Sequence, residues 1–440
     1  MTSRSFQVTV NGAEERVYTT ELGQFCQYEG SYPARVCIRC PGPVETVDIR
    51  PKSRGIAAEW GEKEGRITLT LAAPMKLSIE VNGDLALPLF LFADGPELDR
   101  PDLRDPKVKA YQAGQEYEAG IIELADGETL YIERGAVVHG CVIARDAADV
   151  SIRGRGVLDA SHHQNATQFL GCRGVAISGV TIVKGGIEWV NRIFCCTDVR
   201  ISNYKGVSWG RYSDGLDLLG CRHVRVEDVF IRSEDDSICI KSDKFGFQGD
   251  VEDILVENSV IWNGLGGNAV EIGYETDARY IRDVRFRNLD IIRTDKPKES
   301  WWRRAALSIH HAGSSAVSAI RFEDIRIEAA MESLIYFELV TATPEWGSGG
   351  GTLTDIYLKN IQLTGCRPFH YPGAARQRAG GHCFRGFPVS RQADRQRSGG
   401  AGGRIRYQPC GSDMEVALGQ SGQAGQIDIQ PPAIRGTEEW

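Results

Sequence analysis

Short runs of alternating apolar and polar residues dominate the first part of the chain. Between residues 6 and 95 the clearest are Arg66–Leu71 and Lys76–Val81, and the turn pair Asn82–Gly83 ends the second run. Alternation with period two is typical of a strand with one buried face, and such turns favour antiparallel pairing. We therefore predict a small antiparallel β-sandwich over residues 1–95. The segment 96–106 is rich in proline and aspartate, and we predict that it is a linker.

A different pattern begins near residue 107. An eight-residue unit recurs, with apolar residues at its first, third and eighth positions and Asn or Asp at its fifth. Clear copies start at Val224, Ile254, Val284, Ile320 and Ile356, and weaker ones at Val150, Val175 and Val199. The starts lie 25, 24, 25, 30, 30, 36 and 36 residues apart, so insertions enlarge the later turns.

Such a repeat indicates a solenoid, because one unit cannot bury its apolar face alone whereas stacked units can. A leucine-rich-repeat horseshoe would require segments of helical period, which the sequence lacks. Propeller blades run about 40 residues with antiparallel turns. We predict an all-β protein with a right-handed parallel β-helix over residues 107–365. The tail, 366–440, has no sustained period, and we predict that it is irregular, either disordered or the product of a shifted reading frame.

Length and charge narrow the class of protein. The 440 residues suffice for two domains, and the net charge of −8 disfavours nucleic acid or an anionic membrane as a partner. The first residues run directly into a strand pattern without an apolar leader. The twelve cysteines are then expected to be reduced thiols, and the expected location is the cytoplasm.

Paired acids mark one part of the predicted β-helix. Asp214 and Asp217 flank Gly215 and Leu216, and the pair Asp235–Asp236 begins 21 residues after Asp214. This offset is close to one turn, so we expect Asp214 to lie nearly above Asp235. Hydrolysis with inversion requires an acid and a base about 6.5–9.5 Å apart, and repulsion among carboxylates raises one pKa. For any one aspartate alone, simple occupation of a turn is the competing interpretation.

These motifs resemble the polygalacturonase family, glycoside hydrolase family 28, whose patterns are Asn-Thr-Asp-Gly-x-Asp and Asp-Asp-Cys-x-Ala-x-Lys-Ser. The matching segments here are Tyr212–Asp217, Asp235–Ser242 and Gly267–Glu275, and the resemblance covers about residues 107–363. It implies that Asp235 is the general acid and that Asp214 and Asp236 hold and activate the attacking water. It also implies that Lys241 contacts substrate.

Two departures bear on the substrate. The family's histidine falls on Asn268, and its Arg-Ile-Lys element falls on Ser308-Ile309-His310. Ser and His cannot reproduce the charge-assisted contact that Arg and Lys make with a galacturonate carboxylate. The layout with an N-terminal sandwich also resembles the dextranase and isopullulanase group, glycoside hydrolase family 49, which acts on neutral α-glucans. A neutral glycan is thus the leading substrate class, with an α-glucan, a galactoside and a rhamnoside left open.

Further residues are candidates for binding the sugar. Trp209, five residues before Asp214, could stack on a sugar face, as could Trp189, Trp301 and Trp302. The full set of predicted substrate-binding residues is Lys241, Asn268, Trp209, Arg211, Tyr274, Glu275, Arg304 and His310.

Two other functions fit the same fold. A pectate-lyase-like enzyme would hold Ca²⁺ on the aspartates, although no further metal-ligand spacing appears and we expect no metal or cofactor. A glycan-binding β-helix without activity would not need three mutually repelling acids. The partner is therefore expected to be a carbohydrate, with the linkage, exo or endo action and the oligomeric state left open.

Overall fold

The computed structural model describes residues 5–61, 63–295, 304–330, 333–340 and 343–363, and the short strands 405–407, 413–418 and 426–429. This part of the chain is all-β, and its only helical segment is the 3-10 turn η1 (Lys52–Arg54). Among the described residues, no helix is long and apolar enough to span a membrane. Most of the tail predicted to be irregular lies outside the described residues.

The N-terminal strands form two packed five-stranded sheets. In spatial order, the first contains β2 (Ala13–Glu15), β1 (Gln7–Val10), β5 (Ala34–Arg39), β8 (Arg66–Leu71) and β7 (Ala58–Gly61). The second contains β3 (Val17–Thr20), β4 (Gly23–Glu29), β10 (Leu89–Asp94), β9 (Met75–Val81) and β6 (Val47–Arg50). All pairs are antiparallel except β4 with β10. Inward residues such as Val36, Ile67 and Ile79 are fully buried between the sheets, which confirms the predicted sandwich.

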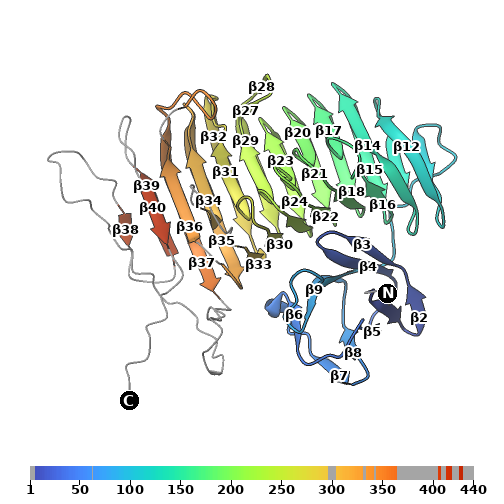
Figure 1. The fold of residues 1–440 in the computed structure, drawn as a ribbon. Coiled ribbons are helices and arrows are strands. Elements are labelled where there is room, and N and C mark those ends of the chain that lie inside the picture. Colours follow the sequence, from blue (N-terminus) through green and yellow to red (C-terminus); the bar gives the residue numbers. More distant parts are fainter. Residues whose placement is uncertain are drawn as a thin grey trace, which may run out of the picture.

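The remaining strands wind into a parallel β-helix (Figure 1), as predicted. Its first turns comprise β11 (Val108–Tyr111), β12 (Glu116–Glu123), β13 (Thr129–Ile132) and β14 (Val137–Arg145). Three columns of paired strands follow, here called sheets A, B and C. Sheet A contains β15 (Ala148–Gly154), β18 (Arg173–Ser178), β21 (Thr197–Ser202), β24 (Arg222–Glu227), β29 (Val251–Glu257), β32 (Tyr280–Arg287), β35 (Ala316–Ile327) and β37 (Thr352–Leu363).

The other two columns complete each turn. Sheet B contains β16 (Val157–Asp159), β19 (Thr181–Lys184), β22 (Lys205–Ser208), β25 (Phe230–Ser233), β30 (Val260–Asn263) and β33 (Asp290–Thr294). Sheet C contains β17 (Thr167–Leu170), β20 (Asn191–Phe194), β23 (Leu216–Leu219), β26 (Ile238–Lys241), β31 (Val270–Tyr274), β34 (Ala305–His311) and β36 (Ser333–Leu339). A hairpin, β27 (Asp243–Lys244) with β28 (Phe247–Gln248), follows β26. Beyond residue 365 the pairing is antiparallel: β38 (Ile405–Tyr407) pairs with β39 (Asp413–Leu418), β39 with β37 of sheet A, and β40 (Gln426–Ile429) with β36 of sheet C.

The fifth position of each repeat makes the corner of the turn. Asp228, Asn258, Asn288, Asp324 and Asn360 all have φ between 50° and 57°. Asn and Asp tolerate this left-handed conformation better than other residues with a side chain. Their side chains also bond along the stack, as between Asn288 Nδ2 and Asn258 Oδ1 at 2.7 Å.

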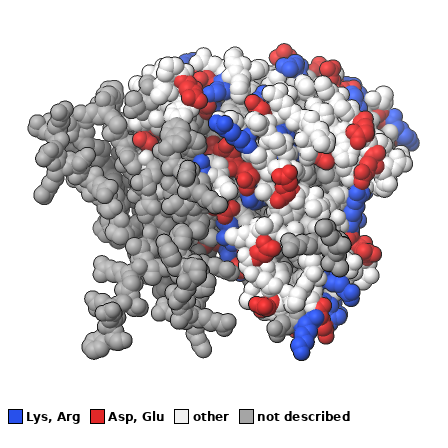
Figure 2. All heavy atoms as spheres, in the orientation of Figure 1, with Lys and Arg blue, Asp and Glu red and all other residues white. Residues whose placement is uncertain are grey.

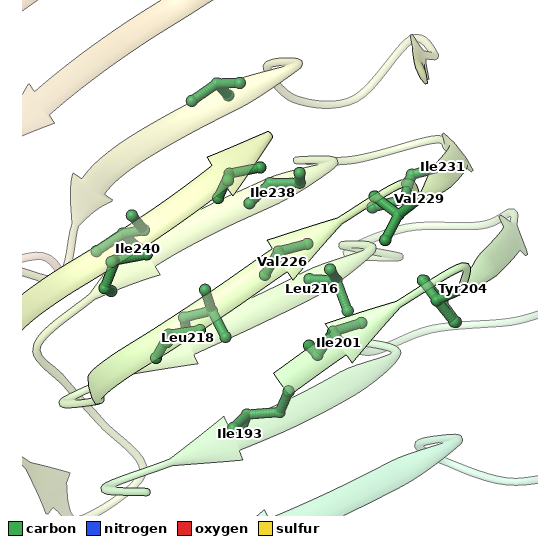
Figure 3. Packing of buried hydrophobic residues seen from close by; sticks show 14 of the residues in the cluster. Ile193, Ile201, Tyr204, Leu216, Leu218, Val226, Val229, Ile231, Ile238 and Ile240 are labelled. Atoms are coloured by element: carbon green, nitrogen blue, oxygen red, sulfur yellow. The ribbon is translucent and has the colours of Figure 1, made fainter. Parts of the chain in front are cut away.

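The core consists of rows of apolar side chains, one from each turn. Figure 3 shows part of two such rows, with Ile193, Leu218 and Ile240 of sheet C in one and Ile201 and Val226 of sheet A in the other. These side chains are fully buried. Full burial of a residue of this size contributes about 1.5–3 kcal/mol, so the stacking of turns stabilises the β-helix.

The sandwich packs against sheet B through a buried interface. Phe90 and Phe92 of β10 lie 5.2 and 5.0 Å from the ring of Phe230 in β25. Beside them, Lys205 Nζ donates to Asp94 Oδ2 at 2.6 Å, and both residues are buried. Over the described part of the face in Figure 2, acidic and basic side chains are interspersed.

Candidate active site

The candidate site lies on the outward face of sheet C. In β23, Leu216 and Leu218 point into the core, so Asp217 between them points outward. The strand register then places Asp217 beside Cys239, Cys239 beside Glu271, and Glu271 beside Ser308. This row of four side chains, here called the outward row, is completely shielded from solvent.

A lysine stands beside the outward row. Lys241 is the last residue of β26, and its Nζ donates to Glu275 Oε2 at 3.0 Å and to Gly273 O at 3.2 Å. The same atom is 3.9 Å from Asp214 Oδ2 and 4.5 Å from the centre of the Trp189 ring. Although burial opposes it, nearby carboxylates, among them Glu275, raise the pKa of Lys241, so the side chain stays charged. Lys241 thus forms an ion pair with Glu275 and lies close to Asp214.

The three predicted acids lie on the turns that enter β23 and β26. The register of these strands pairs residues 22 apart, and the backbone N–H of Gly215 donates to Asp236 O at 2.8 Å. The turn of Asp214 therefore stacks on Asp236, whereas the spacing in the sequence had suggested Asp235. That prediction was wrong by one residue, because strand register rather than average turn length determines which side chains stack.

Asp236 is held more firmly than Asp235. Its Oδ1 accepts hydrogen bonds from Asn268 N at 2.7 Å and Asn268 Nδ2 at 3.1 Å. Asp235 is only partly buried, and its Oδ1 accepts from Asp236 N at 3.0 Å. The chain passes so close at Gly267 that a Cβ there would lie 2.3 Å from Asp236 Oδ1 and 2.6 Å from Asp235 Oδ1. Glycine at this position therefore lets the backbone pack against both acids.

Burial raises the pKa of four aspartates of the site, Asp214, Asp217, Asp235 and Asp236. It raises the pKa of Asp236 to about 7, with further contributions from the charges of Glu271 and Asp235. It raises the pKa of Asp217 to about 8, and the pKa values of Asp214 and Asp235 are also raised. Four clustered carboxyl groups beside one lysine cannot all be ionised, so the site retains protons near neutral pH.

Asp214 and Asp236 approach each other closely. One carboxylate oxygen of Asp214, one of Asp236 and Cys239 Sγ all lie within 4.8 Å of one another. Asp214 Oδ1 has no hydrogen-bond partner among the described residues. Calcium prefers six to eight oxygen ligands, and a thiol with a lysine 3.9 Å from Asp214 is a poor set for that ion.

A second cluster surrounds Glu271. Its carboxylate accepts the Ser308 hydroxyl and, at 3.1 Å, His310 Nδ1. The His310 ring stacks on Tyr274 with centroids 4.5 Å apart. Although burial opposes it, Glu271 raises the pKa of His310. Cys239 and Glu271 were not predicted, and Asp217 was given no role. The signal for them was a non-aliphatic residue between two aliphatic ones, which occurs in β23, β26, β31 and β34.

The structure brings most of the predicted substrate-binding residues to this region. Glu275 is buried between Lys241 and Lys244, and these lysines lower its pKa although burial opposes the shift. Burial raises the pKa of Asp235, and the charge of Arg304 is among the contributions that oppose this rise. Both ends of the Asn268 amide bond other protein groups, because Nδ2 donates to Asp236 and Oδ1 accepts the N–H of Ala305 at 2.8 Å. Contact of these residues with substrate stays a prediction.

The aromatic candidates are distributed differently. Trp209 packs over Gly185, where a Cβ would lie 2.7 Å from the ring, and at the edge of the interface with the sandwich. Trp189 is buried beside Leu170, Phe194 and Leu219, and Lys241 of the site lies over its ring. Arg211 is exposed, with its guanidinium 4.5 Å from the centre of the Tyr212 ring. Trp301 and Trp302 lie outside the described residues.

Buried acids around a lysine on the outside of a parallel β-helix are an arrangement that suits cleavage of glycosidic bonds. The family described as Glycosyl hydrolases family 28 matches residues 142–367, just over half of the chain, and the chain belongs to this family. It is a glycosidase that acts on O-glycosidic bonds of a carbohydrate. No curated protein sequence matches the chain.

Solved structures support the fold. Dex49A from Penicillium minioluteum is similar with a TM-score of 0.58 and 14% identity, over 84% of this chain and 90% of that one. An exopolygalacturonase from Thermotoga maritima matches at 18% identity and TM-score 0.43, over 57% of this chain and 73% of the other. An endo-xylogalacturonan hydrolase from Aspergillus tubingensis matches at 15% identity and TM-score 0.44, over 60% of this chain and 78% of the other. At these identities the likeness to Dex49A shows the architecture, and the two weaker matches add no argument.

Proposed function

We propose that the chain hydrolyses a neutral oligo- or polysaccharide with inversion, using Asp235 as general acid and Asp214 with Asp236 to hold the attacking water. The observation that carries this proposal is the approach of Asp214 and Asp236 oxygens to within 4.8 Å. Two carboxylate oxygens that share one water each accept from it at about 2.8 Å, so they must lie as near to each other as this bound requires.

The surroundings of the two carboxylates suit this role. Asn268 occupies Asp236 Oδ1 with two hydrogen bonds, which fixes the orientation of the carboxylate. Asp214 Oδ1, without a partner among the described residues, is available to accept a proton of the water. Burial raises the pKa of Asp214, and Lys241, 3.9 Å from Asp214 Oδ2, opposes this rise in favour of the charged form that the water requires.

Asp235 suits the role of acid. It is more accessible than Asp214 and Asp236, and burial raises its pKa, which favours the protonated form. A protonated carboxyl can donate to the oxygen of the leaving sugar. Because a water held by two carboxylates attacks, no covalent sugar intermediate forms and the configuration inverts.

The charges along sheet C favour a neutral sugar. The positions at which the family resemblance implies Arg and Lys are Ser308 and His310, and both are bonded to the buried carboxylate of Glu271. Lys241 is likewise engaged with Glu275. A uronate carboxylate bound beside Ser308 and His310 would lie near the Glu271 carboxylate and would find no uncommitted cation. The cost of removing water from the uronate would then be poorly compensated.

Release of reducing sugar from a panel of dextran, pullulan, rhamnogalacturonan oligosaccharides and polygalacturonate tests the proposal. We expect turnover of a neutral member by the wild type and a loss of roughly 10²–10⁴-fold in kcat for Asp235→Asn. The control is Asp324→Asn, because Asn258 and Asn288 occupy the same corner in other turns. Proton NMR of the first product formed reports whether the anomeric configuration inverts.

Other results would contradict specific parts. Cleavage of polygalacturonate alone would overturn the neutral substrate. A calcium-dependent activity that yields an unsaturated product would indicate a lyase. Absence of turnover on every member would favour a glycan-binding β-helix.

A further inference from the structure

A hollow of about 440 Å³ lies where the chain leaves sheet C on three different turns. Its walls are Asp243 after β26, Asp277 after β31, and the segment 343–348 after β36. Segment 343–348 belongs to one of the insertions that enlarge the later turns, and the proposed cleavage makes no use of it. The volume is within the range of about 300–1,000 Å³ typical of ligand pockets.

The hollow is connected to the acids by a chain of charged groups. Lys244, in the hairpin beside Asp243, donates from its Nζ to the backbone O of Glu345 at 3.2 Å and is 2.9 Å from Glu275 Oε1. Glu275 in turn contacts Lys241, which is 3.9 Å from Asp214. Because neighbouring turns are only about 4.8 Å apart, a glycan lying along sheet C could reach both places.

Hydrogen bonds and close backbone packing hold the walls of the hollow. Asp277 Oδ2 accepts the N–H of Ser348 at 2.8 Å, and Asp277 Oδ1 accepts the N–H of Ser314 at 2.8 Å. Gly347 packs so closely on the preceding turn that a Cβ there would lie 2.5 Å from Ala312 O. Asp277 and Gly347 thus anchor the inserted segment.

Trp346 brings an aromatic ring to the hollow. It is partly buried, and its ring centroid lies 4.8 Å from that of Tyr274, whose ring stacks on His310 of sheet C. Indole rings present a large apolar surface with a polar edge, which suits the face of a pyranose ring. The charged residues that line the hollow are the acids Asp243, Asp277 and Glu345, and among the described residues no cation lines it.

From this arrangement we propose that the hollow is a remote sugar-binding subsite, in which Trp346 stacks on a neutral sugar unit of the substrate and Asp243 accepts a hydrogen bond from its hydroxyl. Asp243 Oδ1 already accepts the N–H of Asp277 at 2.7 Å. The sugar hydroxyl would therefore donate to the second oxygen, Oδ2. The assignment rests on the proposed glycosidase function. A sugar bound here belongs to the same glycan as the cleaved bond. It lies where the chain leaves β26, β31 and β36, whereas the acids lie where the chain enters β23 and β26.

The test is the dependence of kcat/KM on the length of the oligosaccharide. Malto- and isomalto-oligosaccharides from the dimer to the octamer are the first probes. For Trp346→Ala we expect kcat/KM to fall roughly tenfold on the longest substrates and to stay unchanged on the shortest, because only long chains reach the ring. Trp346→Phe should recover most of the loss. Trp60→Ala is the matched control, since Trp60 is an exposed tryptophan of the sandwich.

Asp243→Asn provides a second test, because the amide oxygen can still accept the N–H of Asp277 while the charge is lost. We expect the same selective loss on long substrates. A decrease that is equal at all lengths, or no decrease in either variant, would overturn the subsite. Calorimetric binding of the same series to Asp235→Asn, with and without Trp346→Ala, separates the two proposals. An inactive wild type contradicts the hydrolysis, whereas equal affinities with and without Trp346 contradict the subsite.

Discussion

Replacing Asn268 by alanine tests how the site controls the protonation of Asp236. Asn268 donates to Asp236 Oδ1 from its backbone N–H and, at 3.1 Å, from its side-chain Nδ2. Alanine keeps the first bond and removes the second. It also removes the acceptor for the Ala305 N–H, which Asn268 Oδ1 binds at 2.8 Å.

The expected size follows from these bonds. A hydrogen bond to a charged group contributes about 1.5–3 kcal/mol, which corresponds to about one to two pKa units. In the wild type, the bond from Asn268 Nδ2 stabilises the charged form of Asp236. Removing it raises the pKa of Asp236, which burial already places at about 7. The charged form that holds water is then populated only at higher pH. The acidic limb of the pH profile of kcat/KM should therefore move to higher pH by the same one to two units.

The assay is kcat/KM between pH 4 and 10 on the substrate that the wild type cleaves. Asn268→Ala should also lower the free energy of unfolding by about 1–3 kcal/mol, because the Ala305 N–H stays buried without a partner. The control is Asn258→Ala, which places alanine at a left-handed φ of 55° on an exposed corner of sheet A and loses the bond to Asn288. It should lose stability without a shift of the profile. An acidic limb that stays in place while Asn268→Ala loses activity would refute the reasoning.

Two further substitutions test buried charge. In the folded state Asp217 keeps its proton up to a pKa of about 8, whereas the unfolded chain releases it near pH 4, so its contribution to stability falls as pH rises between these values. Asp217→Asn should therefore stabilise the fold more at pH 8 than at pH 5, by up to about 4 kcal/mol in urea unfolding, and an equal effect at both pH values would contradict this. Arg50 contacts Glu328 at 2.5 Å and Glu80 at 3.2 Å at the buried interface. Arg50→Ala should cost about 3–5 kcal/mol, against less than about 1 for the exposed Arg16→Ala, and similar losses in the two variants would contradict this assignment.

The β-helix could be predicted because its causes are local in the sequence. Two-residue alternation specifies each strand, and the Asn or Asp at the fifth position of the repeat specifies the corner, as the left-handed φ of Asn258 and Asn288 shows. The interface with the sandwich has no such signal. The pairing of Asp94 with Lys205 joins residues 111 positions apart, and nothing in the flanking sequence marks either one.

The site could be predicted only in part. The motifs located Asp214, Asp235 and Asp236, but their stacking depends on a register of 22 residues that turn length does not specify. Glu271 was missed because a buried acid in a strand stands out only when its neighbours Val270 and Ile272 are assigned to the core. Whether an aromatic residue contacts a ligand or an interface depends on tertiary packing, which no local pattern specifies.

Stacking of turns also sets how strongly the acids of the outward row repel one another. The row runs Asp217, Cys239, Glu271 and Ser308, so a neutral residue follows each acid. Burial raises the pKa of Cys239 well above its usual value, which keeps that thiol uncharged. Acids on adjacent turns would be about 4.8 Å apart and repel by about 3.5 kcal/mol at an effective dielectric constant of 20, whereas a turn between them halves this to about 1.7 kcal/mol. Within the outward row, the uncharged residue on the intervening turn therefore limits the repulsion between Asp217 and Glu271 at pH values where both are ionised.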